Sequence, residues 1–325
     1  MANQRPRKKL RSYRFRTARE RQLQTAIFLV CAVVLIVSVW QLGSYVSDYN
    51  RSRRQAAELL ALYDAEVETA TPVPVTQAPV VTEAPPPPET TDVPLPTEIV
   101  SPTPDPLSTM VPQPYPKNPY RLVSDRFSKL RRQNSDIIGW LDLGELLQQA
   151  VVQRDNSYYL RRDYQGYHNT NGAIFLDEAC SLQTRPHTLI LYGHNMKTGA
   201  MFGSLRNYEN ITFYHRNPFI TFDTMYEEGR YVIFSVAVVS INSQSRKYAG
   251  FYRLPNCTLL EREAIIQELR TLSSHTCTID VSVDDQLLLL VTCVDDESDR
   301  RIVAARRIRD DESEDALFNQ IQRSR

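Results

Sequence analysis

The pattern of apolar and polar positions first separates a single long apolar stretch from the rest of the chain. This stretch, TAIFLVCAVVLIVSVWQLG, runs from Thr25 to Gly43 and contains no charged residue. A helix needs about 20 apolar residues to cross the hydrocarbon core of a bilayer, so the stretch predicts a transmembrane anchor that ends near the interfacial Trp40. A buried helix of a soluble core is one alternative, but such a helix is rarely apolar on every side. A cleaved signal peptide is the other, but the residues after the stretch offer no A-x-A-like cleavage site.

Further along, between residues 118 and 309, the apolar runs are short and typical of β-strands. A helix is predicted first, because Val123, Phe127 and Leu130 are spaced by four and three residues. Two more helices are expected, over Thr258–Leu272 and over Ala200–Asn207. Many short strands with few helices favour a β-sandwich or a β-barrel. The predicted strands are Ile137–Leu143, Ala150–Gln153, Gly172–Leu176, Thr188–Tyr192, Phe219–Asp223, Tyr231–Ile241, Thr276–Val281, Gln286–Thr292 and Arg301–Ile308.

The distribution of charge predicts how the anchor is oriented in the membrane. Nine Arg and Lys residues, but only one acid, Glu20, lie between Met1 and Gln24. A basic run of this kind can be a nucleic-acid-binding arm, but its position directly before the anchor indicates the positive-inside rule instead. Residues 1–24 are therefore predicted to be a cytoplasmic tail, and everything after residue 43 to be extracellular. The 38 basic and 38 acidic residues of the whole chain cancel, so net charge points to no partner, and no nucleic acid is expected.

Composition divides the remaining chain. Residues 44–70 are charged and rich in helix formers, which predicts a juxtamembrane helix. Residues 71–117 contain fifteen prolines, too many for a packed core, so an extended linker reaching on the order of 100 Å is expected. A proline-rich ligand for a recognition domain is the alternative interpretation. The predicted globular domain covers residues 118–309, and residues 310–325 are interpreted as a charged, frayed tail.

Two of the predicted strands end in residues that can carry chemistry. The run LILYGHNM places His194 just past an apolar strand, and the run QLLLLVTC ends at Cys293 beside a polar loop. Each residue alone is more often structural than catalytic, and a free cysteine most often behaves as a small buried hydrophobe. Together they form a potential pair, because a thiol becomes nucleophilic when a neighbouring histidine or cation favours the thiolate.

An arginine follows at the start of the next apolar strand, RRIVAARRI. If this strand forms a hairpin with the preceding one, Arg301 lies near Cys293 and is placed to stabilise an oxyanion. A surface charge on a strand is the alternative role for this arginine. No Asp, Glu and His residues are spaced like a metal-ligand set, and no Gly-rich phosphate loop is present, so neither a metal nor a cofactor is expected.

At this point the motifs resemble those of a known family. The set YGHNM…MFGSL, the strand end TC and the strand start RIV are similar to the class B sortases, cysteine transpeptidases that attach surface proteins to the peptidoglycan of Gram-positive bacteria. NSDIIGWLDL, VVQRDNSYYL and NTNGAIFLDE resemble further segments of that family. The resemblance covers about residues 120–308. It implies a mainly β fold, a closed sortase-type barrel of about eight strands with an N-terminal helix and one late inserted helix.

The resemblance also implies roles for individual residues. The family's catalytic His, Cys and Arg correspond to His194, Cys293 and Arg301, and its substrate-groove residues to Asn156, Leu160 and Tyr192. The implied partners are surface proteins with a sorting motif and an amine of a peptidoglycan precursor. One position departs from the family pattern: similar enzymes carry T-L-S-T-C before the nucleophile, whereas this chain has Val291 two residues before Cys293.

Other functions remain open at this stage. A pilus-type sortase would join protein subunits through a lysine. An L,D-transpeptidase is disfavoured, because its histidine would lie two residues before the cysteine, whereas His194 and Cys293 are 99 residues apart. A non-catalytic, stalked binding domain would predict that Cys293 reacts no faster than Cys180, Cys257 and Cys277. The sequence does not decide whether Cys257 and Cys277 form a disulfide.

Overall fold

The computed structural model describes residues 18–65, 105, 107–294 and 298–325. Most of the predicted cytoplasmic tail and the proline-rich stretch from residue 66 to 104 therefore lie outside the described residues. The chain divides into two compact units, one ending at Asn50 and the other running from Arg51 to Arg325.

The first unit is dominated by helix α1 (Ala18–Asp64), which contains the long apolar stretch. Its large apolar side chains are exposed; Phe28 and Trp40 are 73% and 72% accessible. Leaving this much apolar surface in water costs about 25 cal/mol per Å². Among the described residues, α1 is the one helix long and apolar enough to cross a membrane. The predicted anchor therefore coincides with a continuous helix whose surface suits lipid.

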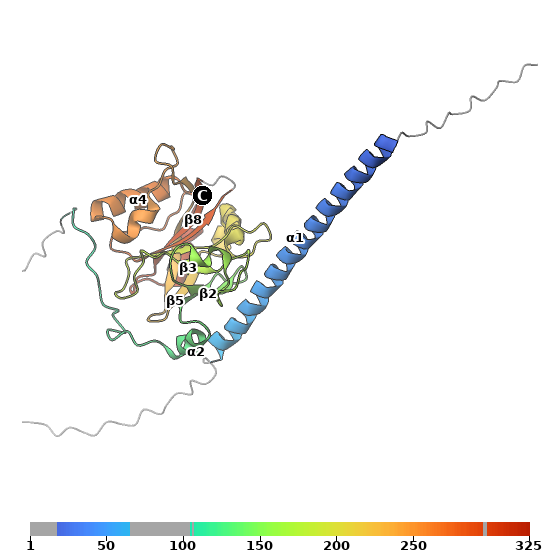
Figure 1. Cartoon of the computed structure of the whole chain (residues 1–325). Coiled ribbons are helices and arrows are strands. Elements are labelled where there is room, and N and C mark those ends of the chain that lie inside the picture. Colours follow the sequence, from blue (N-terminus) through green and yellow to red (C-terminus); the bar gives the residue numbers. More distant parts are fainter. Residues whose placement is uncertain (1–17, 66–104, 106, 295–297) are drawn as a thin grey trace, which may run out of the picture. The chain divides into compact units, whose positions relative to one another are not determined.

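The second unit is built around a closed eight-stranded β-barrel, as the sequence predicted (Figure 1). Around the barrel the strands follow the order β1-β2-β3-β4-β7-β8-β6-β5. The β2–β3 and β4–β7 pairs are parallel, and the other neighbours are antiparallel. The strands are β1 (Ile137–Asp142), β2 (Gln148–Val152), β3 (Ile174–Leu176), β4 (Thr188–Tyr192), β5 (Phe219–Thr224), β6 (Arg230–Ser240), β7 (Leu287–Cys293) and β8 (Asp299–Arg307).

Helices cover the barrel, so several strands are buried on both faces and read as continuous apolar runs rather than alternating ones. Helix α4 (Leu259–Thr271) is the late helix predicted from the sequence. It begins with a capping box, in which Thr258 and Glu261 bond to each other's backbone N–H groups. Its buried Leu269 accepts a hydrogen bond at the backbone carbonyl from Ser235 Oγ of β6, at 2.6 Å. This bond fixes α4 against the barrel wall.

Shorter helices complete the unit, and some differ from the sequence-based expectation. The helix predicted over Ala200–Asn207 is a 3₁₀ helix displaced by two residues, η2 (Phe202–Glu209). The opening helix is confirmed as α2 (Asp125–Gln133), with Phe127 and Leu130 buried. The others are η1 (Tyr158–Arg161), α3 (Ile211–Arg216), η3 (Phe251–Asn256) and α5 (Glu314–Ile321).

Two predictions about the C-terminal part of the chain were wrong. The segment Thr276–Val281 is not a strand. Its backbone bonds to the end of the chain, where Thr276 N donates to the carbonyl of Arg325. Nor is the C-terminal segment a frayed tail, because α5 buries Leu317 and Ile321. The two segments hold each other in place, so neither contributes to the barrel sheet.

The last turns of α1 belong to the second unit and pack on the barrel. Leu59 is only 2% exposed. The ring of Tyr63 stacks on Trp140 of β1, with 4.7 Å between the ring centroids. Gln55 donates a hydrogen bond to the buried Asp163 at 3.0 Å. The helix thus reaches the barrel before the proline-rich stretch begins. After that stretch the chain is again fixed to the same unit, where Tyr115 is 1% exposed.

Candidate active site

The parallel pairing of β4 and β7 brings the predicted histidine and cysteine together. The register runs from Thr188 opposite Leu287 to Tyr192 opposite Val291. One more bond, from Gly193 N to the carbonyl of Val291, extends it past the end of β4. His194 and Cys293 each lie two residues beyond the last pair, and parallel strands that are in register end at the same level. Two residues that are 99 positions apart in the sequence therefore lie side by side in the backbone.

The segment after β4 holds His194 in a defined position. A Cβ atom at Gly193 would lie 2.9 Å from the ring of Phe202, so only glycine fits there. The carbonyl of His194 accepts hydrogen bonds from Met196 N and Phe202 N, at 3.1 and 3.0 Å. Met201, at the start of η2, has a φ of 50°, and such strain in a non-glycine residue is most common at functional sites.

The side chain of His194 is partly exposed, and its orientation is set by a backbone carbonyl. Nε2 lies 2.6 Å from the carbonyl oxygen of Leu160. A carbonyl oxygen only accepts hydrogen bonds, so Nε2 carries a proton and donates it to this bond. Nδ1 is thereby left as the ring nitrogen that the Leu160 carbonyl does not engage. Leu160, predicted as a groove residue, lies directly beside the histidine.

The other two predicted groove residues lie near the same barrel end. Tyr192 is the last residue of β4, and burial, together with the nearby Asp177 carboxylate, raises the pKa of its phenol well above the ordinary value; the charge of Arg300 acts in the opposite direction. Tyr192 therefore stays protonated at neutral pH. Asn156 accepts a hydrogen bond from the backbone N of Glu178 at 3.0 Å. It supports the loop after β3 rather than contacting the histidine.

The two consecutive arginines of β8 have different surroundings. Arg301 is 8% exposed, and its Nε and Nη2 lie 2.9 and 2.8 Å from Oε1 of Glu209, at the end of η2. Arg300 is partly exposed and donates a hydrogen bond to the carbonyl of Asp299 at 3.0 Å. In the β7–β8 ladder, Arg300 pairs with Cys293 and Arg301 pairs with Thr292. No pattern in the sequence indicated the Glu209 contact, because Glu209 lies 92 positions before its partner.

Three further cysteines of the second unit, Cys180, Cys257 and Cys277, are buried or partly buried. Cys180, Cys257 and Cys277 are free thiols, which answers the question about a disulfide between the last two. Burial raises the pKa of Cys180 to about 12 and also raises the pKa values of Cys257 and Cys277. At neutral pH these three stay protonated, and a protonated thiol is a poor nucleophile. They act as core residues.

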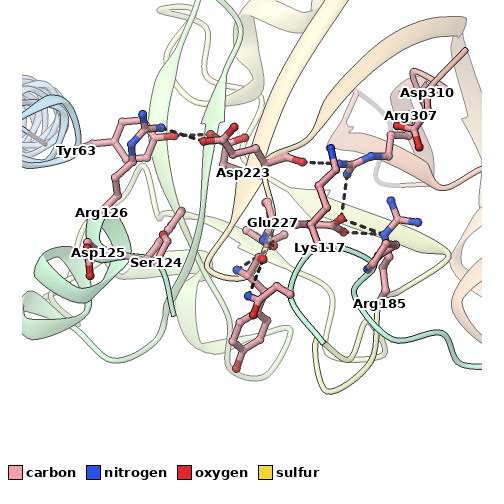
Figure 2. Close-up of a pocket in the computed structure, with 16 residues that line it drawn as sticks. Tyr63, Lys117, Ser124, Asp125, Arg126, Arg185, Asp223, Glu227, Arg307 and Asp310 are labelled. Carbon is pink, nitrogen blue, oxygen red and sulfur yellow. Dashed lines mark hydrogen bonds and ion pairs between the residues drawn. The ribbon is translucent and has the colours of Figure 1, made fainter. Parts of the chain in front are cut away.

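A pocket of about 600 Å³ lies elsewhere on the second unit, near the barrel end where β4 and β7 begin (Figure 2). Its charged groups already neutralise each other. Arg185 lies 3.0 Å from Glu227, and Tyr63 donates a hydrogen bond to the buried Asp223 at 2.5 Å. The lining includes none of the residues predicted to be catalytic or to bind substrate. This pocket has the groups of a structural charge network, and the predicted nucleophile Cys293 lies at the other end of the barrel, where β7 ends.

Comparison with known proteins agrees with the fold. The family model described as "Sortase domain" matches residues 147–308. Sortase B of Staphylococcus aureus (strain NCTC 8325 / PS 47) is 30% identical over 190 residues, covering 57% of this chain and 75% of that protein. Sortase B of Listeria monocytogenes serovar 1/2a is 30% identical over 179 residues, covering 54% and 70%.

Solved structures give the same result. A Staphylococcus aureus sortase B–substrate complex superposes with a TM-score of 0.51 at 28% identity, covering 58% of this chain and 87% of that one. Sortase B from B. anthracis in complex with AAEK1 gives a TM-score of 0.50 at 27% identity, covering 57% and 86%. The chain belongs to the sortase family, is similar to its class B members, and is a sortase transpeptidase.

Proposed function

We propose that this transpeptidase cleaves a sorting motif after its threonine and transfers the carrier protein to an amine of peptidoglycan or its precursor. The observation that carries the proposal is the register of β4 and β7, which brings His194 and Cys293 to the same level of the barrel. A thiol and an imidazole in this relation suit acyl transfer, because the histidine can favour the thiolate and later donate a proton.

The chemistry proceeds in two balanced steps. First, the Cys293 thiolate attacks the threonine carbonyl, and the C–N bond breaks as His194 donates a proton to the departing amine. The product is a thioester between enzyme and substrate. Second, an amine attacks the thioester carbonyl and the C–S bond breaks, while His194 accepts the proton of the incoming amine. An arginine at the start of β8 stabilises the oxyanion in both steps; Arg301 is the residue that the sequence favoured for this role.

The bond between His194 and Leu160 defines how the histidine takes part. The Leu160 carbonyl holds the Nε2 proton, so Nδ1 is the atom that gains and loses a proton during turnover. The same contact supports Leu160 and Tyr192, which lies two residues before His194, as substrate-groove residues.

Location fits this function. With residues 1–24 in the cytoplasm and α1 in the membrane, the catalytic domain faces outward, where surface proteins and wall precursors meet. The wide apolar surface of α1 supports the anchor, and the basic tail supports the orientation.

The experiment uses the full-length chain in detergent micelles, because residues 51–64 are part of the catalytic unit and a shorter fragment would lose their packing. The chain is incubated with a library of threonine-containing sorting peptides, and intact-mass spectrometry detects a covalent adduct. We expect an acyl adduct with the wild type and none with Cys293→Ala. Transfer to a peptidoglycan-type amine supports wall attachment, whereas transfer only to a lysine side chain would indicate protein–protein joining. Absence of any adduct would contradict the proposed reaction.

A further inference from the structure

The last turns of α1 pack on the rest of the second unit through apolar and polar contacts. Leu59 is buried, and the ring of Tyr63 stacks on Trp140 of β1. Burial of apolar surface and aromatic stacking both favour such an association in water. One turn earlier, Ser52 and Gln55 are also buried, although both side chains are polar. Buried polar groups are normally hydrogen-bonded, so the partners of these two side chains define the polar part of the contact.

Both polar side chains bond to the loop between η1 and β3, the η1–β3 loop. Ser52 Oγ accepts hydrogen bonds from Nδ2 of Asn169 and Nδ2 of Asn171, each at 3.1 Å. Gln55 donates from Nε2 to a carboxylate oxygen of Asp163 at 3.0 Å. All three loop residues are buried. Part of the hydrogen bonding of this loop is therefore supplied by α1 rather than by the barrel.

The η1–β3 loop also contacts the carbonyl group that orients His194. At the start of the loop, Arg161 accepts a hydrogen bond at its carbonyl from Asn169 N at 3.0 Å. Gly172 has a φ of 63°, and a Cβ atom there would lie 2.6 Å from the carbonyl oxygen of Leu160. The same oxygen lies 2.6 Å from Nε2 of His194. The backbone of the loop is thus packed against the acceptor of the histidine's hydrogen bond.

A small cavity connects α1 with the histidine segment from another direction. Its lining includes Ser52 and Gln55 of α1, part of the η1–β3 loop, and Met201. Met201 forms an isolated β-bridge with Asn195, the residue after His194. The last turns of α1 therefore border both the loop behind the Leu160 carbonyl and the residue that pairs beside the histidine.

The path of the chain separates this contact from the proline-rich stretch. The predicted anchor ends at Gly43, and the second unit begins at Arg51, before that stretch starts. After the stretch, the hydroxyl of Tyr115 donates a hydrogen bond to the carbonyl of Leu182 at 3.2 Å. The residues before and after the stretch belong to the same unit, so the route from the anchor to this unit does not run through it.

We propose that the last turns of α1 are a docked part of the second unit with two roles. They attach this unit to the anchor independently of the proline-rich stretch, and they position the η1–β3 loop against the Leu160 carbonyl that orients His194. Ser52 is the main positioning residue, because its hydroxyl bonds to two side chains of the loop. The second role rests on the proposed function, since it assigns His194 to the reaction, whereas the first role does not.

The first role is tested by cutting the chain. A site for a sequence-specific protease is inserted within residues 80–90 of the full-length chain, which carries an N-terminal affinity tag and is held in detergent micelles. After complete cleavage, we expect the C-terminal fragment to stay bound to the tagged fragment. The double variant Leu59→Asp/Tyr63→Ala should release it, whereas Arg54→Ala, at an exposed position of the same turns, should not. Release from the wild type, or retention in the double variant, would overturn the proposal.

The second role is tested by kcat and KM with an accepted peptide. A misplacement of about 1 Å can cost roughly 10²-fold in rate, so Ser52→Ala should lower kcat by about ten- to a hundredfold with KM little changed. Ser52→Thr keeps the hydroxyl and should recover most of this loss. Ser52→Ala combined with His194→Gln should lose no more than His194→Gln alone, because Ser52 acts through the histidine. Losses that multiply, or an unchanged kcat in Ser52→Ala, would contradict the positioning role.

A readout without turnover separates this role from the proposed function. If the wild type forms no acyl adduct, amide hydrogen exchange over residues 159–173 replaces the kinetics. Ser52→Ala should speed exchange in this region, because the loop loses two hydrogen bonds to α1 and opens more readily. Arg54→Ala should leave the exchange unchanged. Equal exchange in the wild type and Ser52→Ala would overturn the positioning role, independently of the proposed reaction.

Discussion

The two ends of the barrel use charged residues in different ways. Where β4 and β7 begin, acids and bases compensate one another: Arg306 is fully buried and lies 2.6 Å from Glu312 and 3.2 Å from Asp280. Where β4 and β7 end, His194 and Arg300 are partly exposed. Compensated charges fix the first end, whereas His194 at the other end bonds a backbone carbonyl and stays partly exposed.

Buried polar groups show the same contrast. Four buried side-chain atoms among the described residues have no hydrogen-bond partner, and three of them belong to Ser204, Tyr208 and Thr292. These residues lie on η2 and β7, the elements that support the histidine and carry the cysteine. Unsatisfied buried groups are uncommon in folded proteins. Because each unsatisfied buried group costs free energy, these three groups lower the local stability of η2 and β7.

The largest expected effect comes from a pair of histidines at the two ends of β4. His194 and His187 each bond a backbone carbonyl through Nε2, at 2.6 and 2.8 Å. General acid–base catalysis contributes roughly 10²–10⁴-fold to rate, so His194→Gln should lower kcat by that factor. His187→Gln, the matched control, should leave kcat near the wild-type value. Steady-state kinetics with an accepted peptide compares them, and equal losses would remove the functional distinction between the ends.

The next largest effect concerns stability at the charged end. Removing one partner of a buried ion pair typically costs about 3–5 kcal/mol, which we expect for the free energy of unfolding of Arg306→Met. The control is Arg230→Met, which breaks the exposed Arg230–Glu314 pair and should cost about 0–1 kcal/mol. Urea unfolding followed by circular dichroism measures both. Similar costs would mean that the Arg306 network contributes no more than a surface pair.

A smaller effect is expected where α1 meets the barrel. Tyr63 donates to Asp223, and burial raises the pKa of this carboxyl group, partly offset by that bond and by one from Gly229 N. Tyr63→Phe keeps the stacking on Trp140 but leaves the buried carboxyl group with one partner fewer, at a cost of about 1–3 kcal/mol. Thermal unfolding should show a lower Tm with kcat unchanged. An unchanged Tm would indicate that the helix docks through its apolar contacts alone.

The smallest effect is a change in the pH dependence of stability. Burial alone would raise the pKa of Glu312, but hydrogen bonds from Arg306 and from the Arg309 backbone lower it below the ordinary value. A lowered folded-state pKa stabilises the protein above the unfolded pKa, and this stabilisation is lost as the pH falls through the folded value. Glu312→Gln should therefore flatten the decline of the unfolding free energy below about pH 4. If the free energy of unfolding of Glu312→Gln declines as steeply as that of the wild type, other carboxyl groups cause the decline.

The sequence predicted the barrel and the site because the relevant strands are continuous apolar runs with distinct ends. The apolar runs of β4 and β7 can be recognised without knowing which strands lie beside them. Thr276–Val281 shows a similar alternation, but its backbone partners are at the C-terminus, and no local pattern reveals them. Helix α5 was missed because only Leu317 and Ile321 are buried among many charges.

The sequence favoured Arg301 as the oxyanion stabiliser, but the face of the sheet that each of the two arginines occupies could not be predicted from the sequence. It depends on the register of β7 and β8, and a slip of one residue exchanges the faces of every side chain in a strand. The Arg301–Glu209 contact is equally invisible, since it joins two segments that only the folded barrel brings together. Motifs indicated which end of the barrel carries His194 and Cys293, whereas the surroundings of the two arginines follow from the three-dimensional register.

The central claim is that the register of β4 and β7 makes Cys293 a reactive thiol, and the most direct test is site-resolved alkylation of the full-length chain in detergent. The chain is treated with limiting iodoacetamide at neutral pH, and peptide mass spectrometry follows each cysteine. The account predicts that Cys293 is modified well before Cys180, Cys257 and Cys277, and that His194→Gln slows this reaction while His187→Gln does not. Modification of Cys293 at the same rate as the three buried thiols, unaffected by His194→Gln, would contradict it.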